Sequence, residues 1–118
     1  MIVDITPQNF HAALLDASMQ KPVVIYFYAP QLPECQSITP LVESIVGNDN
    51  QAVTLAKVDV NDPQLQSLAM QLGLRALPAL VKFHQGRPDE QGFLEGPQDE
   101  ATLRNYFAAF APREEELL

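Results

Sequence analysis

The fold is decided by residues 23–36, which read VVIYFYAPQLPECQ. The first seven form an unbroken run of β-branched, aromatic and small apolar side chains. Such a run is typical of a central strand that is covered on both faces. Residues 31–34 predict a turn into a helix, in which Pro40 should introduce a kink. The helix is indicated by apolar residues at i, i+3, i+4 and i+7 spacing, namely Ile38, Leu41, Val42 and Ile45.

Working outward, strands and helices alternate along the chain. Further strands are predicted at residues 2–5, 53–60, 80–83 and 92–95, with a turn at 85–88 inside a final hairpin. Helices are predicted to begin at Thr6, at Asp62 and after Pro97, and Gly73 should end the second of these. The last helix carries an apolar stripe made of Leu103, Tyr106, Phe107 and Phe110. This order predicts an α/β fold, with a mixed sheet covered by helices on both faces.

Composition limits the classes of function. The 118 residues suit one domain, which we expect to span residues 1–111. The formal charge of -8 argues against binding to nucleic acid, which needs clustered lysine and arginine. No apolar stretch approaches the roughly 20 residues of a membrane span, and the first residues do not resemble a signal peptide. We therefore expect a cytoplasmic protein that binds neither nucleic acid nor membrane.

Two motifs carry a resemblance to a known family. Residues 27–36 resemble the segment F-W-A-x-W-C-G-P-C-K of the thioredoxin family without gaps, and residues 73–80, GLRALPAL, are similar to its loop G-I-R-G-I-P-T-L. The resemblance covers nearly the whole chain and implies the thioredoxin fold, βαβαβ followed by a hairpin and a helix. It also implies that Pro78 follows a cis peptide bond and faces the cysteine motif.

Within that family the chain is most similar to the N-terminal domain of the chaperedoxins, YbbN or CnoX. That group also has a non-cysteine residue first and a cysteine fourth in the motif, and residues 112–117, PREEEL, resemble the end of its domain. The resemblance implies a domain that binds unfolded client proteins and protects their cysteines by mixed disulfides through Cys35. It implies that residues 112–118 begin a linker or helical region, with transfer of clients to chaperonin or other folding chaperones through a C-terminal region.

The alignment removes part of the family's chemistry. Leu32 stands where the attacking cysteine would be, and leucine can neither ionise nor form a disulfide, so dithiol turnover is not expected. Tyr26 replaces the family's buried aspartate, and a phenol is a poor base at neutral pH. Lys57 is then expected to lack its usual acidic partner.

Cys35 has two interpretations. As the candidate catalytic residue it would form mixed disulfides, and its place in the first turn of a helix would lower its pKa, although Glu34 opposes this. Alternatively, it is a small buried hydrophobic residue.

The family's substrate groove supplies the other candidate residues. An exposed Leu32 would form an apolar docking patch for a peptide, whereas a Leu32 tucked into the core would not. The predicted substrate-binding residues are Leu32, Pro33, Leu77, Pro78, Gly96 and Pro97.

Three functions remain open: a client-binding domain, which we favour, a single-thiol disulfide oxidoreductase, and a structural adaptor with an inert cysteine. His11 and His84 lack partners at metal-ligand spacing and are expected at the surface, so neither a metal nor another cofactor is predicted. Met19 and Met70 are interpreted as packing residues.

Overall fold

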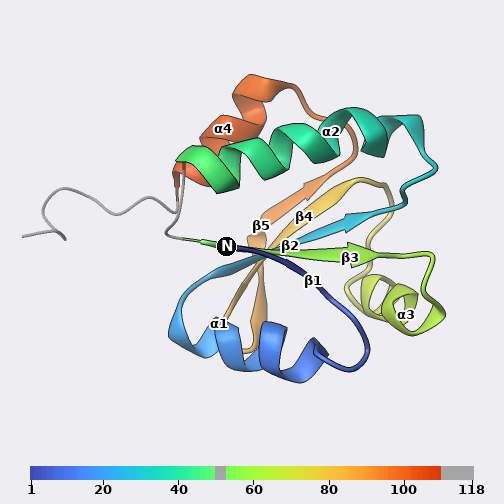
Figure 1. The fold of residues 1–118 in the computed structure, drawn as a ribbon, viewed down its shortest axis with the longest axis vertical. Helices are drawn as coiled ribbons and strands as arrows, with labels where there is room; N and C mark the ends of the chain where they lie inside the picture. Colours follow the sequence, from blue (N-terminus) through green and yellow to red (C-terminus); the bar gives the residue numbers. More distant parts are fainter. Residues whose placement is uncertain (50–52, 110–118) are drawn as a thin grey trace, which may run out of the picture.

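The computed structural model describes residues 1–49 and 53–109, and these contain a five-stranded sheet with the order β1-β3-β2-β4-β5 (Figure 1). The strands are β1 (Ile2–Asp4), β2 (Val23–Tyr28), β3 (Thr54–Asp59), β4 (Ala79–His84) and β5 (Arg87–Glu95). The first three are parallel to one another, whereas β4 and β5 are antiparallel to their neighbours. The apolar run of β2 therefore lies at the centre of a mixed sheet, as its composition predicts.

Helices cover both faces of the sheet. They are η1 (His11–Asp16), α1 (Ala17–Gln20), α2 (Pro33–Ser44), η2 (Ile45–Asp49), α3 (Pro63–Gln71) and α4 (Glu100–Ala108), of which η1 and η2 are π-helical. In Figure 1, α2 and α4 lie above the sheet, and α1 and α3 lie below it. The predicted α/β class with its two covered faces is confirmed. None of the helices within the described residues is long and apolar enough to cross a bilayer.

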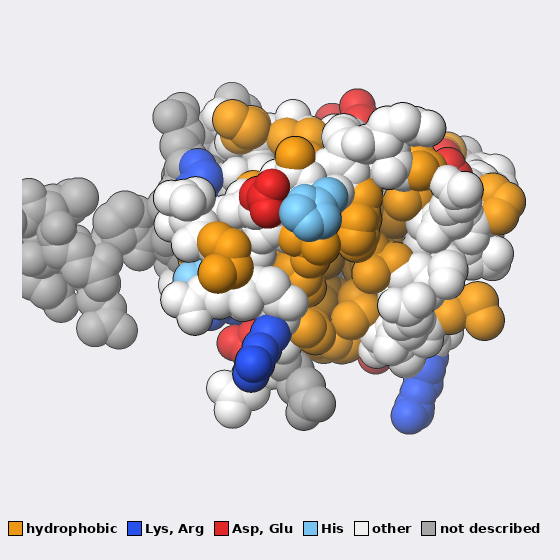
Figure 2. Space-filling model, turned by 90° about the horizontal axis from the view of Figure 1, so that it is seen from below, with side chains coloured by type: hydrophobic (Ala, Val, Ile, Leu, Met, Phe, Trp, Pro, Cys, Tyr) orange, Lys and Arg blue, Asp and Glu red, His pale blue; other side chains and the backbone are white. Residues whose placement is uncertain are grey.

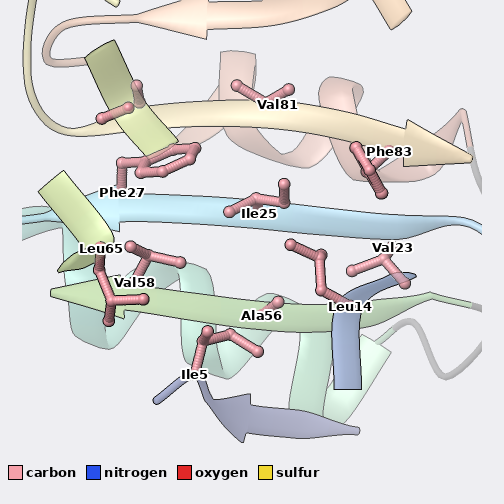
Figure 3. Close-up of a cluster of buried hydrophobic side chains, with 12 residues drawn as sticks. Ile5, Leu14, Val23, Ile25, Phe27, Ala56, Val58, Leu65, Val81 and Phe83 are labelled. Carbon is pink, nitrogen blue, oxygen red and sulfur yellow. The ribbon is translucent and has the colours of Figure 1, made fainter. Parts of the chain in front are cut away.

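Alternation along β2 separates two hydrophobic clusters. Val23, Ile25 and Phe27 point to the lower face, where they pack with Leu14 and Leu65 from the helices (Figure 3). Val24 and Tyr26 point to the upper face, where Ile38 of α2 and Leu103 of α4 cover them. Because successive side chains of a strand point to opposite faces, one apolar run contributes to both clusters.

The helix ends follow local hydrogen-bonding chemistry. The Asp62 carboxylate accepts a hydrogen bond from the Gln64 amide at 2.9 Å, which caps α3 as predicted. Gly73 has a φ of +74°, which suits the residue that ends α3. Thr6 and Asn9 form a reciprocal pair of hydrogen bonds of the kind that caps a helix, as predicted for Thr6, and after a turn at residues 7–9 the helix η1 begins at His11.

The hairpin differs from its prediction. Only Gln85 and Gly86 form the turn, with φ values of 53° and 77°, and β5 extends over residues predicted as turn and loop. Positive φ at two successive residues is the conformation that closes a tight hairpin. Pro88 is accommodated because β5 is the outermost strand, where a missing amide leaves no neighbour unpaired.

Candidate functional site

The start of α2 positions the two residues of the altered cysteine motif. Leu32 is the N-cap residue, and its carbonyl accepts hydrogen bonds from the amides of Cys35 and Gln36, both at 3.0 Å. Pro33 follows at a position where a helix has no partner for an amide. Leu32 offers no side-chain acceptor to the free amides, so this helix start lacks a side-chain cap. Its side chain is half-buried, between the two predicted alternatives.

Cys35 faces the protein interior. Its side chain is 0% exposed, and Sγ accepts a hydrogen bond from the Ala29 amide at 3.4 Å. Burial raises the pKa of the thiol, and this effect outweighs the Ala29 hydrogen bond, which favours the thiolate. The nearby Glu34 carboxylate raises the pKa further. A buried thiol with a raised pKa is poorly placed to attack a disulfide, which argues against both thiol-based interpretations in the folded state.

Beneath this helix, Tyr26 occupies the position of the family's aspartate. It is fully buried, and its hydroxyl lies 2.7 Å from Thr39 Oγ1 of α2. Burial raises the pKa of Tyr26 to about 12, so the phenol stays protonated at neutral pH. Tyr26 therefore joins α2 to the sheet and supplies no base.

Lys57 lacks the family's usual acidic partner, since Tyr26 stands in that place, but two other carboxylates lie near it. Its Nζ lies 2.6 Å from the Glu43 carboxylate and 3.7 Å from that of Asp4, and it is 5.2 Å from the centre of the Tyr28 ring. Burial lowers the pKa of Lys57, but the hydrogen bond to Glu43 and the charges of Tyr28, Glu43 and Asp4 together raise it by more, so the pKa of Lys57 is raised overall. The nearer carboxylate, Glu43, comes from α2 and the other, Asp4, from β1, and the motif alignment reveals neither.

A groove of about 340 Å³ opens beside Leu32. Leu32 and Leu77 border it together, so the structure brings these two predicted residues into one site. The remaining lining comes from the residue that follows β3, from α3 and from the segment after α3, namely Val60, Gln66, Ala69, Met70, Leu74, Arg75 and Ala76. A second pocket, separate from this groove, is lined by apolar and polar residues, namely Pro7, Phe10, Gln64, Leu65, Ser67, Leu68 and Gln71. Seen from below, the molecule has a hollow in which hydrophobic side chains gather (Figure 2).

The other predicted groove residues lie elsewhere. The peptide bond between Leu77 and Pro78 is cis, as predicted, but Pro78 itself is buried. Gly96 is buried next to it, and its amide donates to the Pro78 carbonyl at 2.8 Å. Pro33 and Pro97 are exposed and do not border this groove. Pro78 and Gly96 thus hold the loop before Pro78 in place instead of lining the groove.

Met70 is the main groove residue that sequence reasoning misses. Its interpretation as a packing residue is wrong, because 73% of its surface is exposed. A signal is present in the helical spacing, since Leu65 and Ala69 mark the buried face of α3 and Met70 lies one position beyond it. This spacing predicts an exposed side chain, and Met70 is exposed at the border of the groove. Met19, for which packing is also expected, is 58% exposed.

Comparisons with known proteins show the family to which the chain belongs. The family model for thioredoxin matches residues 1–109. The chain belongs to the thioredoxin family. This thioredoxin-family chain is 32% identical to the thioredoxin-like protein slr0233 of Synechocystis over 94 residues, which are 80% of this chain and 86% of that one. It is also 32% identical to thioredoxin of Alicyclobacillus acidocaldarius over 102 residues, covering 84% and 91% of the two chains.

The family likeness extends to larger proteins and to solved structures. Protein disulfide-isomerase 1 of Dictyostelium discoideum is 32% identical over 108 residues, but the match covers 89% of this chain and only 29% of the isomerase. The structure of Malassezia sympodialis thioredoxin superimposes with a TM-score of 0.76 at 26% identity, covering 95% of this chain and 92% of that one. A thioredoxin variant from Halobacterium salinarum gives 0.74 at 27% identity with the same coverage. These matches confirm the thioredoxin fold.

Proposed function

We propose that this chain is a client-binding thioredoxin domain of the chaperedoxin type, which holds extended apolar segments of unfolded cytoplasmic proteins without dithiol chemistry. The binding site is the groove bordered by Leu32, Met70, Leu74 and Leu77, called the client groove below. The observation that carries the proposal is that Leu32, in the position of the attacking cysteine, borders the same groove as Leu77. The position that carries the attacking thiol in the family would therefore provide a hydrophobic contact to the client.

The size and composition of the client groove support a peptide ligand. Its volume of about 340 Å³ suits one or two apolar side chains of an extended segment, and it is too small for a folded domain. Helix α3, which forms one wall, has the sequence PQLQSLAMQ and carries no charged residue. In a chain with a net charge of -8, this depletion of charge is typical of the centre of an interface.

Cys35 takes no part in this binding while the domain is folded. Its sulfur is inaccessible, so a mixed disulfide would require the start of α2 to open. The same burial gives less support to a single-thiol oxidoreductase, because the reactive species of that chemistry is an accessible thiolate. Binding of an apolar segment in the client groove requires neither an accessible sulfur nor a thiolate.

The test measures light scattering of a heat-denatured client enzyme with and without the 118-residue chain. We compare the wild-type chain with Leu32→Ser and with the matched control Met19→Ser, which removes an exposed apolar side chain from α1, outside the groove. The wild type and Met19→Ser should suppress aggregation, and Leu32→Ser should lose most of the effect. Equal protection by the wild type and Leu32→Ser, or no protection by either, would contradict the proposal.

A second assay separates binding from redox activity. Reduction of insulin disulfides in the presence of dithiothreitol should remain at the background rate, because no second thiol exists to resolve a mixed disulfide. An ordinary thioredoxin is the positive control. Turnover close to that of the control would overturn the proposed function.

A further inference from the structure

We propose that Met70 is an oxidation site of the client groove, and that converting its thioether to a sulfoxide weakens client binding. The inference rests on the proposed function, and it concerns the regulation of that site. Met70 is 73% exposed and borders the client groove, whereas Cys35 is 0% exposed. The sulfur that a soluble oxidant reaches at this site is therefore a thioether instead of a thiol.

The chemistry of the two sulfur atoms strengthens this contrast. A thiol reacts as its thiolate, so burial and a raised pKa both protect Cys35. A thioether needs no deprotonation. With a hydroperoxide as oxidant, a lone pair of the Met70 sulfur attacks the terminal peroxide oxygen, an S–O bond forms and the O–O bond breaks. The sulfur is oxidised by two electrons. The other peroxide oxygen takes up the proton of the transferred hydroxyl and leaves as water or as an alcohol.

A sulfoxide would change what the client groove can bind. Leu32, Leu74 and Leu77 border the groove together with Met70, so an apolar side chain of a client would contact the new S–O group. A sulfoxide oxygen accepts hydrogen bonds, and covering it with an apolar client removes it from water at a cost in free energy. This cost disfavours an apolar ligand.

Met19 provides a matched control within the chain. It is 58% exposed, so it should also be oxidised, but it lies on α1 and does not border the client groove. Oxidation of Met19 should therefore leave client binding unchanged. Loss of binding should depend on the position of the oxidised sulfur, and not on the oxidation of methionine in general.

The experiment treats the wild-type chain, Met70→Leu and Met19→Leu with hydrogen peroxide, which is then removed with catalase. Peptide mass mapping locates the added oxygen. Fluorescence anisotropy measures the Kd for a labelled short peptide of leucine, serine and lysine, which contains no sulfur. Each variant is compared with its own untreated sample. Peroxide should raise Kd about tenfold for the wild type and Met19→Leu, and should leave Kd of Met70→Leu unchanged. A methionine sulfoxide reductase should restore binding.

The possible failures are distinguishable. A wild type that carries the Met70 sulfoxide and binds the peptide as tightly as before would overturn this inference and leave the proposed function standing. The inference fails in the same way if peroxide weakens Met70→Leu as much as the wild type, or if mapping finds Met70 unmodified while Met19 is oxidised. Absence of peptide binding by the untreated wild type would overturn the proposed function, and this inference with it.

Discussion

Cys35 lacks both conditions that make a thiol reactive, which are access to solvent and a lowered pKa. The helix start that could activate it instead places its sulfur beneath the Ala29 amide. Its neighbour Leu32 is more accessible but chemically inert. At the scale of single residues, a half-buried leucine stands where the family has its attacking cysteine, and the one remaining thiol is buried.

The burial of Cys35 can be measured directly. We expect a thiol reagent to label the folded chain at least about a hundredfold more slowly than the urea-unfolded chain at the same pH, because only opened molecules expose the sulfur. The measurement is the rate of labelling by mass spectrometry. Similar rates in the two states would show that the sulfur is accessible and would restore the mixed-disulfide interpretation.

Tyr26 predicts how stability depends on pH. Its pKa is raised from 10 to about 12 in the folded state, so between these values the folded chain keeps a proton that the unfolded chain loses. The contribution of Tyr26 to the free energy of unfolding should be constant below pH 10 and should fall as the pH rises toward 12. A shift of this size corresponds to about 3 kcal/mol.

Urea unfolding of the wild type and of Tyr26→Phe at neutral and alkaline pH checks this prediction. The variant should lose about 1 kcal/mol at neutral pH with the Thr39 hydrogen bond, but its stability should fall less steeply above pH 10. Some alkaline loss remains, because burial also raises the pKa of Tyr106. Parallel pH profiles for the two proteins would contradict the assignment to Tyr26.

At the scale of the elements, the hairpin shows how one residue permits the approach of two strands. A Cβ added at Gly92 of β5 would lie 2.4 Å from the Cβ of Lys82 on β4, far inside normal contact. The register of the two strands shifts between Val81 and Lys82, so the irregularity lies beside this glycine. A β-carbon at position 92 would require β5 to move, since the atom it meets is fixed to the backbone.

We therefore expect Gly92→Ala to lower the free energy of unfolding by about 1–3 kcal/mol, measured by urea denaturation. Gly47→Ala is the matched control, because its new Cβ would meet only the end of the Ile2 side chain at 3.9 Å. The control should be neutral or slightly stabilising. A neutral Gly92→Ala would mean that the hairpin adjusts without cost.

The charge of the whole molecule adds a long-range preference to the client groove. A net charge of -8 attracts cationic ligands and repels anionic ones, and salt screens both effects. With the same leucine-containing centre, a lysine-flanked peptide should associate about tenfold faster than a glutamate-flanked peptide at low salt.

Stopped-flow fluorescence measures both association rates as salt is raised. The difference should shrink toward equality at about 0.5 M salt, whereas the hydrophobic contribution to binding should persist. Faster binding of the acidic peptide at low salt would show that Arg75, which borders the groove, dominates over the charge of the whole chain.

Much of the fold was predictable because its signals are local. The apolar run of β2, the Asp62 cap and the glycine after α3 each act through neighbouring residues, and all three lie as predicted. The start of β5 was not predictable, because a proline after a glycine is locally typical of a turn. Pro88 pairs with β4 only because β5 is the outermost strand of the sheet. The acidic segment 112–117 and the domain boundary at residue 111 lie outside the described residues, as does Phe110.

By itself, the sequence determined what chemistry is impossible within these 118 residues. With one cysteine and a leucine at the attacking position, they cannot form a disulfide among themselves whatever the fold, because packing cannot supply a second sulfur. Only the tertiary structure decided which side chains are exposed to solvent and which charged groups form ion pairs. Burial of Cys35, exposure of Met70, and the pairing of Lys57 with Glu43 depend on segments distant in the chain. Solvent access and ion pairing depend on which segments pack against each other, so a local pattern such as the helical spacing around Met70 indicates a face of the helix but not what covers it.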